Sequence, residues 1–170
     1  MKRKEFLKKI SPLISEKNTL AVNTSPRENG NCRKLVSWIN AENPKSSALH
    51  LDNLRILPCK GCLSCLSGPC PLNDDFTKFI NQIKEHEAVI IVSPVFFSGV
   101  PAQLKAAIDR CQFYWSNKIK PAQNREGYFV LTGERSEKDL PCCEKTIKAF
   151  FATLGIKHIK SYYIPKNEII

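Results

Sequence analysis

The apolar run at residues 88–92 limits the possible folds of this chain more than any other stretch. Its sequence is AVIIV, so a strand built from it presents apolar side chains on both of its faces. A strand of this kind belongs in the middle of a parallel sheet that helices cover on both sides. The chain must therefore supply further strands, together with helices that connect them across both faces.

Short apolar segments alternate with segments of helical periodicity along the chain. Strands are predicted at residues 19–23, 47–51, 88–92, 127–131 and 157–164. Helices are predicted between them, from apolar residues three or four apart, at 32–39, 76–83, 104–115 and 147–154. This alternation predicts an α/β fold, and at 170 residues its most economical form is a flavodoxin-like, doubly wound, five-stranded parallel sheet in the order 2-1-3-4-5. In that order, ligands bind beyond the carboxyl ends of the first and third strands.

The two ends of the chain depart from the regular form of this fold. No helical pattern follows the fifth strand, so no closing C-terminal helix is expected. An apolar stripe precedes the first strand instead, formed by Phe6, Leu7, Ile10, Leu13 and Ile14. We predict an extra N-terminal helical extension at 1–18, split at Ser11-Pro12 with Ser11 as a new cap, and a main domain at 19–170. The stripe is expected to pack where the closing helix would lie; docking on a neighbouring subunit is the alternative.

The loop after the first strand has the composition of a phosphate-binding site. Residues 23–32, NTSPRENGNC, lead directly into a predicted helix. Backbone N–H groups at a helix N-terminus point at an anion, the helix end carries partial positive charge, and Arg27 can bind a phosphate with two hydrogen bonds. An ordinary capped loop has a similar composition, so the loop alone leaves both interpretations open.

Half of the eight cysteines lie in one short stretch, CKGCLSCLSGPC, inside a cysteine-rich insertion at 59–71. The spacing Cys-x2-Cys-x2-Cys-x4-Cys, followed by Pro71, is close to the bacterial ferredoxin run and indicates one [4Fe–4S] cluster. Structural zinc sites usually have two Cys-x2-Cys pairs separated by a longer loop. Zinc, a disulfide, and thiols that bind no metal stay as alternatives. The predicted metal ligands are Cys59, Cys62, Cys65 and Cys70.

Three segments, in order and at regular spacings, resemble those of the NADPH-dependent FMN reductase superfamily. They are Ser25-Pro26-Arg27 with Gly30-Asn31, the run SPVFFSGVPAQLK that starts at Ser93, and, between these two, the cysteines followed by Asp74-Asp75-Phe76. The third segment resembles the iron–sulfur flavoprotein branch. Two departures lie in the cofactor segments, because Cys32 stands where the family usually has threonine and Phe96 where tyrosine is common.

The resemblance implies FMN as a cofactor, bound by residues at the ends of the first, third and fourth strands. They are Ser25, Arg27, Asn31, Cys32, Pro94, Val95, Phe96, Phe97, Ser98, Thr132 and Gly133. A simple core position is the alternative for the two aromatic residues, and it fits Phe97 better than Phe96. The segment 132–135 is expected to reach the edge of the flavin ring. No side chain is expected to be an obligate catalytic acid or base, because the cofactors carry the chemistry.

The function predicted from these features is that of an FMN-dependent oxidoreductase or electron-transfer protein, an iron–sulfur flavoprotein that passes electrons between FMN and a [4Fe–4S] cluster. The alternatives are a cluster-free NAD(P)H-dependent FMN or quinone reductase and a zinc-bearing binding module. The expected electron partner is NAD(P)H or a small carrier protein such as ferredoxin. The resemblance also implies a homo-oligomer, either a dimer or a tetramer.

Charge and composition bear on the remaining function classes. The formal net charge is +10, but lysine and arginine are spread along the chain and no nucleic-acid-binding motif is present, so no nucleic-acid partner is expected. No apolar run approaches the ~20 residues of a membrane span, and the basic N-terminus has no signal-peptide apolar region. A cytoplasmic location without a membrane partner is expected. Thiols stay reduced there, which favours metal binding over disulfides.

Overall fold

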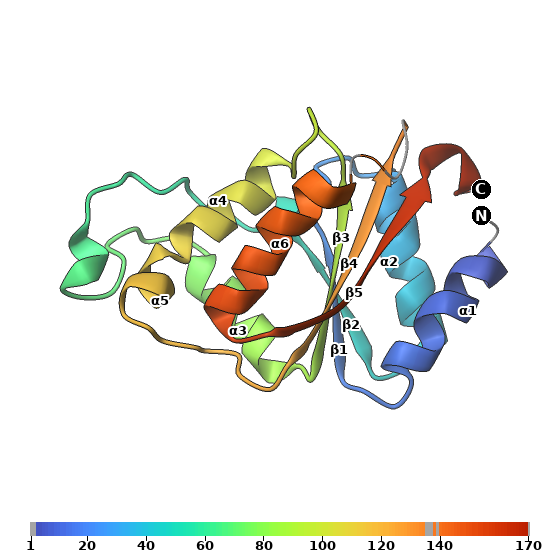
Figure 1. Ribbon diagram of the computed structural model, residues 1–170, viewed down its shortest axis with the longest axis horizontal. Helices are drawn as coiled ribbons and strands as arrows, with labels where there is room; N and C mark the ends of the chain where they lie inside the picture. The colour runs from blue at the N-terminus through green and yellow to red at the C-terminus, as the bar shows by residue number, and fades with distance from the viewer. Residues whose placement is uncertain (1–2, 135–137, 139, 170) are drawn as a thin grey trace.

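The sheet of this protein is five-stranded, fully parallel and ordered β2-β1-β3-β4-β5 (Figure 1). The computed structural model describes residues 3–134, 138 and 140–169. The strands are β1 (Thr19–Asn23), β2 (Ser46–His50), β3 (Ala88–Pro94), β4 (Glu126–Gly133) and β5 (Lys157–Pro165). The apolar run at 88–92 lies in the central strand and is fully buried. The predicted flavodoxin-like order is therefore confirmed.

Helices cover the sheet on both faces (Figure 1). One layer consists of α1 (Arg3–Ile14) and α2 (Asn31–Glu42), and the other of α3 (Phe76–Glu85), α4 (Ala102–Arg110) and α6 (Leu140–Leu154). The central strand serves both layers, because Val89 and Ile91 pack in one core and Ile90 and Val92 in the other. The single helix predicted at 104–115 is in fact two, since α5 (Gln112–Ser116) follows α4 after a break. No helix of the described residues has the length and apolar character needed to cross a bilayer.

α1 covers the sheet face beside β5, in the place of a closing C-terminal helix. Its apolar stripe belongs to one buried cluster with side chains of α2, with Val130 of β4 and with Ile164 of β5. After β5, the described chain forms a short 3-10 turn, Lys166–Glu168, and Ile169 packs into the same cluster. The prediction that the N-terminal stripe substitutes for the closing helix is confirmed.

The prediction that Ser11 and Pro12 split this segment is wrong. α1 is one helix with Pro12 inside it, and the Ser15 N–H still donates to Ser11 O at 2.8 Å. Proline costs ~3 kcal/mol in a helix interior because it removes a backbone hydrogen bond, but here it lies in the last turn. Phe6 and Ile14 are both buried on one side of α1, and their burial requires a continuous helix and offsets that cost.

Gly127 in β4 allows α6 to approach the sheet closely. A Cβ atom at this position would lie 2.5 Å from Phe151 Cε2 and 2.8 Å from Ile156 Cγ2. We expect Gly127→Ala to lower the free energy of unfolding by about 1–3 kcal/mol, because the core must shift to admit the methyl group. Gly68→Ala is the matched control, since a Cβ there meets nothing within 4 Å. Urea unfolding measures both variants, and equal effects would contradict this account of the packing.

Candidate functional site

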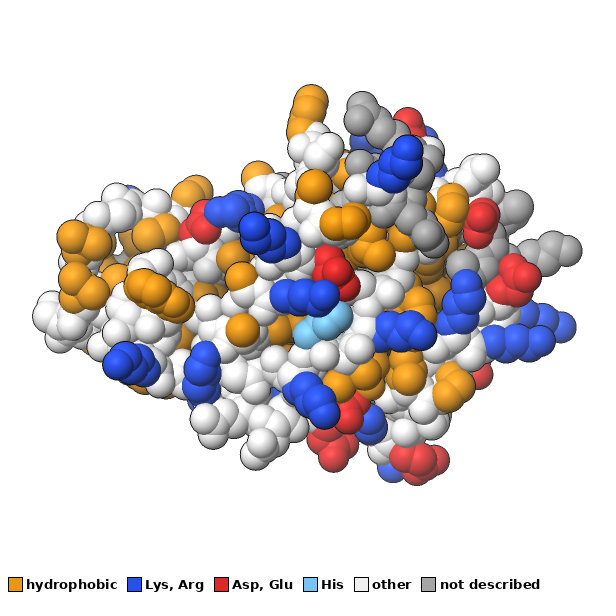
Figure 2. Space-filling model, viewed as in Figure 1, with side chains coloured by type: hydrophobic (Ala, Val, Ile, Leu, Met, Phe, Trp, Pro, Cys, Tyr) orange, Lys and Arg blue, Asp and Glu red, His pale blue; other side chains and the backbone are white. Residues whose placement is uncertain are grey.

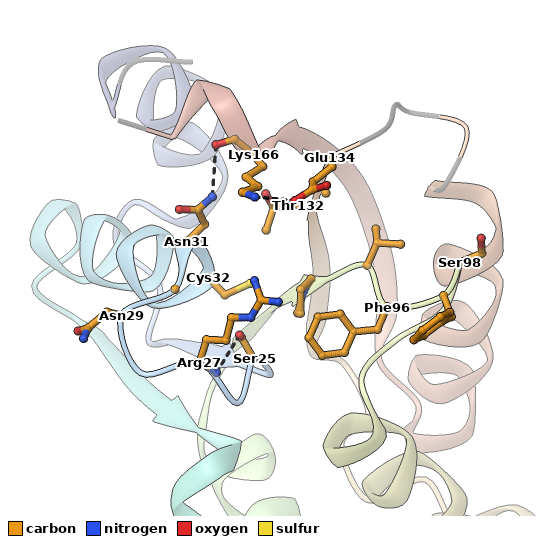
Figure 3. A pocket seen from close by; sticks show the side chains of 15 residues that line it. Ser25, Arg27, Asn29, Asn31, Cys32, Phe96, Ser98, Thr132, Glu134 and Lys166 are labelled. Carbon is orange, nitrogen blue, oxygen red and sulfur yellow. Dashed lines mark hydrogen bonds and ion pairs between the residues drawn. The ribbon is translucent and has the colours of Figure 1, made fainter.

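A pocket of about 650 Å³ lies at the carboxyl ends of β1, β3 and β4 (Figure 3). The structure brings all eleven residues predicted for FMN to its lining. They come from three segments: the loop after β1, the end of β3 with the turn after it, and the end of β4. Lys166, from the turn after β5, also lines the pocket. Sequence reasoning missed it because no motif marked the residues after the fifth strand.

The loop after β1 is held in shape by its own polar groups. The Ser25 N–H donates to Asn23 Oδ1 (3.1 Å), and Asn23 Nδ2 donates back to Ser25 O (3.2 Å). The Arg27 N–H donates to Ser25 Oγ (3.2 Å). The Thr24 N–H and hydroxyl both donate to Val92 O of β3, at 3.0 and 3.2 Å. These bonds tie the loop to the central strand and fix its position at the pocket.

The N-terminus of α2 begins at the pocket lining. Gly30 occupies the N-cap position and, having no side chain, makes no capping bond. A Cβ at Gly30 would lie 3.1 Å from Arg27 O, so the tight loop favours glycine. The next residues, Asn31 and Cys32, line the pocket. Burial raises the pKa of Cys32 to about 12, so its thiol is neutral at neutral pH and adds no charge that would repel an anion.

The turn after β3 holds two phenylalanines in different environments. Phe96 packs beneath the Arg27 guanidinium, 5.8 Å from ring centroid to Cζ (Figure 3). Phe97 is fully exposed and lines the pocket, so the alternative of a core position does not hold for it. The reason is the backbone: Phe96 and Gly99 exchange two hydrogen bonds, which closes a tight turn, and Phe97 and Ser98 have φ values of 49° and 59°. This left-handed backbone costs roughly 1–2 kcal/mol for each non-glycine residue, and it leaves the Phe97 ring outside the core.

The end of β4 supplies a buried hydroxyl to the pocket wall. Thr132 is 5% exposed, and its Oγ1 has no hydrogen-bond partner among the residues that the structure describes. A Cβ at Gly133 would lie 3.1 Å from Val95 Cγ2, so glycine lets β4 end close against the turn after β3. Arg135, the last residue of the segment expected at the flavin edge, lies outside the described residues.

Lys166 connects two sides of the pocket (Figure 3). Its Nζ pairs with Glu134 Oε1 at 2.5 Å, and its backbone oxygen accepts a hydrogen bond from Asn31 Nδ2 at 3.3 Å. The turn after β5 is thereby attached to the N-terminus of α2 and to the residue after β4. Lys166 and Arg27 give the pocket two cationic side chains.

A second cavity, of about 290 Å³, is lined by all four clustered cysteines. Their thiols are free; Cys59 and Cys62 are exposed, while Cys65 and Cys70 are partly exposed. The Gly61 N–H donates to the sulfur of Cys59 at 3.4 Å. Hydrogen bonds from the hydroxyl and backbone of Ser64 lower the pKa of Cys62. Within 3–134, 138 and 140–169, no three His, Cys, Asp or Glu side chains are gathered closely enough to hold a metal ion.

The cysteine loop forms one end of the molecule together with α5. Large apolar side chains are exposed there, at Leu63, Leu66 and Trp115, and Figure 2 shows apolar side chains gathered at this end of the molecule. Asn117 Nδ2 donates to Cys65 O at 2.8 Å and ties the loop to the residue after α5.

A buried ion pair anchors the start of this loop. Arg110 Nη1 and Nη2 contact the two carboxylate oxygens of Asp74 at 2.5 and 3.3 Å, and both side chains are almost fully buried. The same carboxylate accepts the N–H groups of Leu57 (2.8 Å) and Phe76 (3.1 Å). Burial favours a raised pKa for Asp74, but these hydrogen bonds hold it below its ordinary value. Asp74 thereby accepts the first N–H group of α3, whereas the carboxylate of Asp75, the N-cap residue, accepts a hydrogen bond from the Arg55 N–H.

This chain matches one protein family and several individual proteins of known name. Residues 18–168 match the protein family described as NADPH-dependent FMN reductase. An iron–sulfur flavoprotein of Methanocaldococcus jannaschii is 35% identical over 110 residues, which are 59% of this chain and 57% of that protein. An iron–sulfur flavoprotein of Archaeoglobus fulgidus is 36% identical over 95 residues, 54% of this chain and 47% of that protein. The chain thus spans about half the length of the curated relatives it matches.

Solved structures share the fold at low sequence identity. The Trp repressor binding protein from Bacillus subtilis has a TM-score of 0.63 at 16% identity, over 89% of this chain and 88% of that chain. An azoreductase from Bacillus anthracis has a TM-score of 0.65 at 14% identity, over 88% and 87%. Since the family match takes in every strand, the pocket and the cysteine loop, the chain belongs to the NADPH-dependent FMN reductase family, and the two curated relatives named above are iron–sulfur flavoproteins.

Proposed function

We propose that this protein is an FMN-dependent oxidoreductase that exchanges electrons between FMN, bound in the pocket, and a [4Fe–4S] cluster, bound by the cysteine loop. The observation that carries the proposal is that each of the two predicted sets of ligands is gathered at one cavity. The eleven residues predicted for FMN line one pocket, and the four predicted cluster ligands line one cavity. When bound, FMN supplies hydride acceptance and the release of single electrons.

The pocket fits FMN in size and in chemistry. Its volume lies in the usual range for small-molecule sites. The uncapped N-terminus of α2 and the guanidinium of Arg27 suit the phosphate. Phe96 supplies an apolar wall, and the unpartnered Oγ1 of Thr132 needs a polar partner that a ligand in the pocket can provide. We assign no lining residue as an acid or base, because Cys32 is a buried neutral thiol and Glu134 is paired with Lys166.

The cysteine cavity fits an iron–sulfur cluster in its donor set. Thiolates are the usual protein ligands of such clusters, and the lowered pKa of Cys62 favours the thiolate form. No acidic side chain is among the described residues that line the cavity, whereas Lys60 and Arg110 do line it. A positively charged surrounding suits a group that carries net negative charge. Cys59, Cys62, Cys65 and Cys70 would hold the cluster, which supplies one-electron transfer when present.

The electron partner proposed here is NAD(P)H or a small acidic carrier protein of the ferredoxin kind. A carrier protein would approach the end of the molecule formed by the cysteine loop, where Leu63, Leu66 and Trp115 are exposed. The segment 56–73 contains one lysine and no acidic residue. Its charge would therefore favour an acidic partner. We also propose that the protein assembles as a homodimer or a homotetramer.

A second candidate is a cluster-free NAD(P)H-dependent FMN or quinone reductase. It is favoured by the observation that the four sulfurs, although they line one cavity, are not gathered as metal ligands in the described residues. The visible spectrum of protein purified without oxygen separates the two candidates. A broad iron–sulfur absorption beneath the flavin bands supports the first, and flavin bands alone support the second.

Replacing Arg27 should weaken flavin binding. Arg27→Ala removes a charge-assisted contact to the phosphate worth roughly 1.5–3 kcal/mol, so FMN affinity should fall about ten- to hundredfold. Arg33→Ala is the matched control, because Arg33 pairs with Asp52 at 2.7 Å and does not line the pocket. Titration by flavin fluorescence gives the affinities. Wild-type affinity in Arg27→Ala would exclude the proposed phosphate site.

Reconstitution tests the cluster. After anaerobic incubation with iron and sulfide, the wild-type protein should hold about four of each per chain, and Cys65→Ala should hold much less. Cys142→Ala is the control, since Cys142 is an exposed cysteine outside the cavity. Stoichiometric zinc in the purified protein, or no bound iron after reconstitution, would count against the cluster.

A further inference from the structure

Arg110, the last residue of α4, is a buried cation at the wall of the cysteine cavity. The whole residue is 3% exposed, and it lines the cavity together with all four cysteines. Its guanidinium is fixed by the two contacts to Asp74, by a hydrogen bond from Nη1 to Leu57 O (3.2 Å), and by stacking on Phe76, 4.8 Å from the ring centroid. These contacts together give the guanidinium one defined position.

One donor of this guanidinium is unused. Arg110 Nε is buried and has no hydrogen-bond partner within the described chain, and an unsatisfied buried donor is costly. Arg110 and Cys70 line the same cavity, so a sulfur or a bound group there can accept from the free Nε. The guanidinium therefore contacts Asp74 and also forms part of the wall of the cysteine cavity.

The ion pair presents its positive member to the cavity. Arg110 is among the lining residues and Asp74 is not. Lys60, the other cation of the lining, lies on the exposed loop, where solvent screens its charge. Arg110 is the buried one, so its field acts on the cavity through a medium of lower dielectric.

We infer that Arg110 is a positioning and electrostatic residue of the cluster site, with Asp74 as its clamp. This inference rests on the proposed function. The guanidinium would donate to the sulfur of Cys70 or to a bound cluster, and its positive charge would stabilise the additional negative charge of the reduced cluster. Stabilising the reduced form raises the reduction potential, which responds to charge and to hydrogen bonds at the sulfurs.

The test is a redox titration of the reconstituted protein, followed by the electron paramagnetic resonance of the reduced cluster. Arg110→Gln removes the charge, and at a given potential the ratio of reduced to oxidised cluster should fall about tenfold, which is about 59 mV for one electron. Arg110→Lys keeps the charge and should stay closer to wild type. Lys105→Gln is the matched control. It also removes a positive charge from α4, but Lys105 forms an exposed pair with Asp109. This variant should leave the reduction potential unchanged.

Arg110→Gln leaves Asp74 buried without its cation, so Arg110→Gln/Asp74→Asn is measured in parallel. This double variant carries neither charge and avoids an unpaired buried carboxylate. The guanidinium is the member of the ion pair that lines the cavity. The reduction potential of the cluster in the double variant should therefore also lie below that of the wild-type protein. Iron release to a chelator provides a second readout and should be faster in both variants than in Lys105→Gln.

Two outcomes overturn the inference and are distinguishable. If wild type and the Arg110 variants hold equal iron and have equal potentials, the ion pair only shapes the loop, and the proposed function stands. If the wild-type protein itself binds no iron, the cluster fails as part of the proposed function, and the inference fails with it. Iron analysis of the wild type, made first, separates these cases.

Discussion

The pairing of β3 with β1 on one side and β4 on the other is the interaction on which the rest of the structure depends. Asn23 is aligned with Val92, and Thr132 with Pro94, so the three strands end at the same edge of the sheet. Parallel strands that are apolar on both faces need cover on both faces, and the helices that provide it also carry the chain back for each new strand. The pocket lies where three of these strands end, and its position follows from the register.

The two candidate sites are joined by one short helix. The turn that follows β3 lines the pocket and leads through Pro101, the N-cap of α4, to Arg110 at the cysteine cavity. α4 has nine residues, so its length is about 13 Å at 1.5 Å per residue. A rigid element of this length gives the two sites a set separation. Leu104 and Ala107 bury its inner side in the core, so the helix position depends on the same central strand.

Sequence patterns predicted the sheet order, because strand periodicity is a local property of the chain. The residues that the family resemblance and the cysteine spacing indicated do line two cavities, and their roles as ligands stay predictions. The full exposure of Phe97 was not predicted, since an aromatic residue after a buried strand normally enters the core, and the left-handed turn at Phe97 and Ser98 turns it outward. Pro12 suggested a helix break that the burial of the neighbouring stripe overrides. Lys166 and the Arg110–Asp74 pair depend on contacts between segments distant in sequence, which periodicity does not describe.

The position of α1 relates this chain to the regular flavodoxin-like layout by circular permutation. In that layout the helix covering the outer part of this face follows the fifth strand, whereas here it precedes the first. α1 and Ile169 share one buried cluster, so the beginning and the end of the described chain meet side by side (Figure 1). A short linker across this point, with a new opening between α1 and β1, would give the regular connection order without moving a strand. In the described chain this face of the sheet is thus covered from the N-terminal side, while the order of the strands is unchanged.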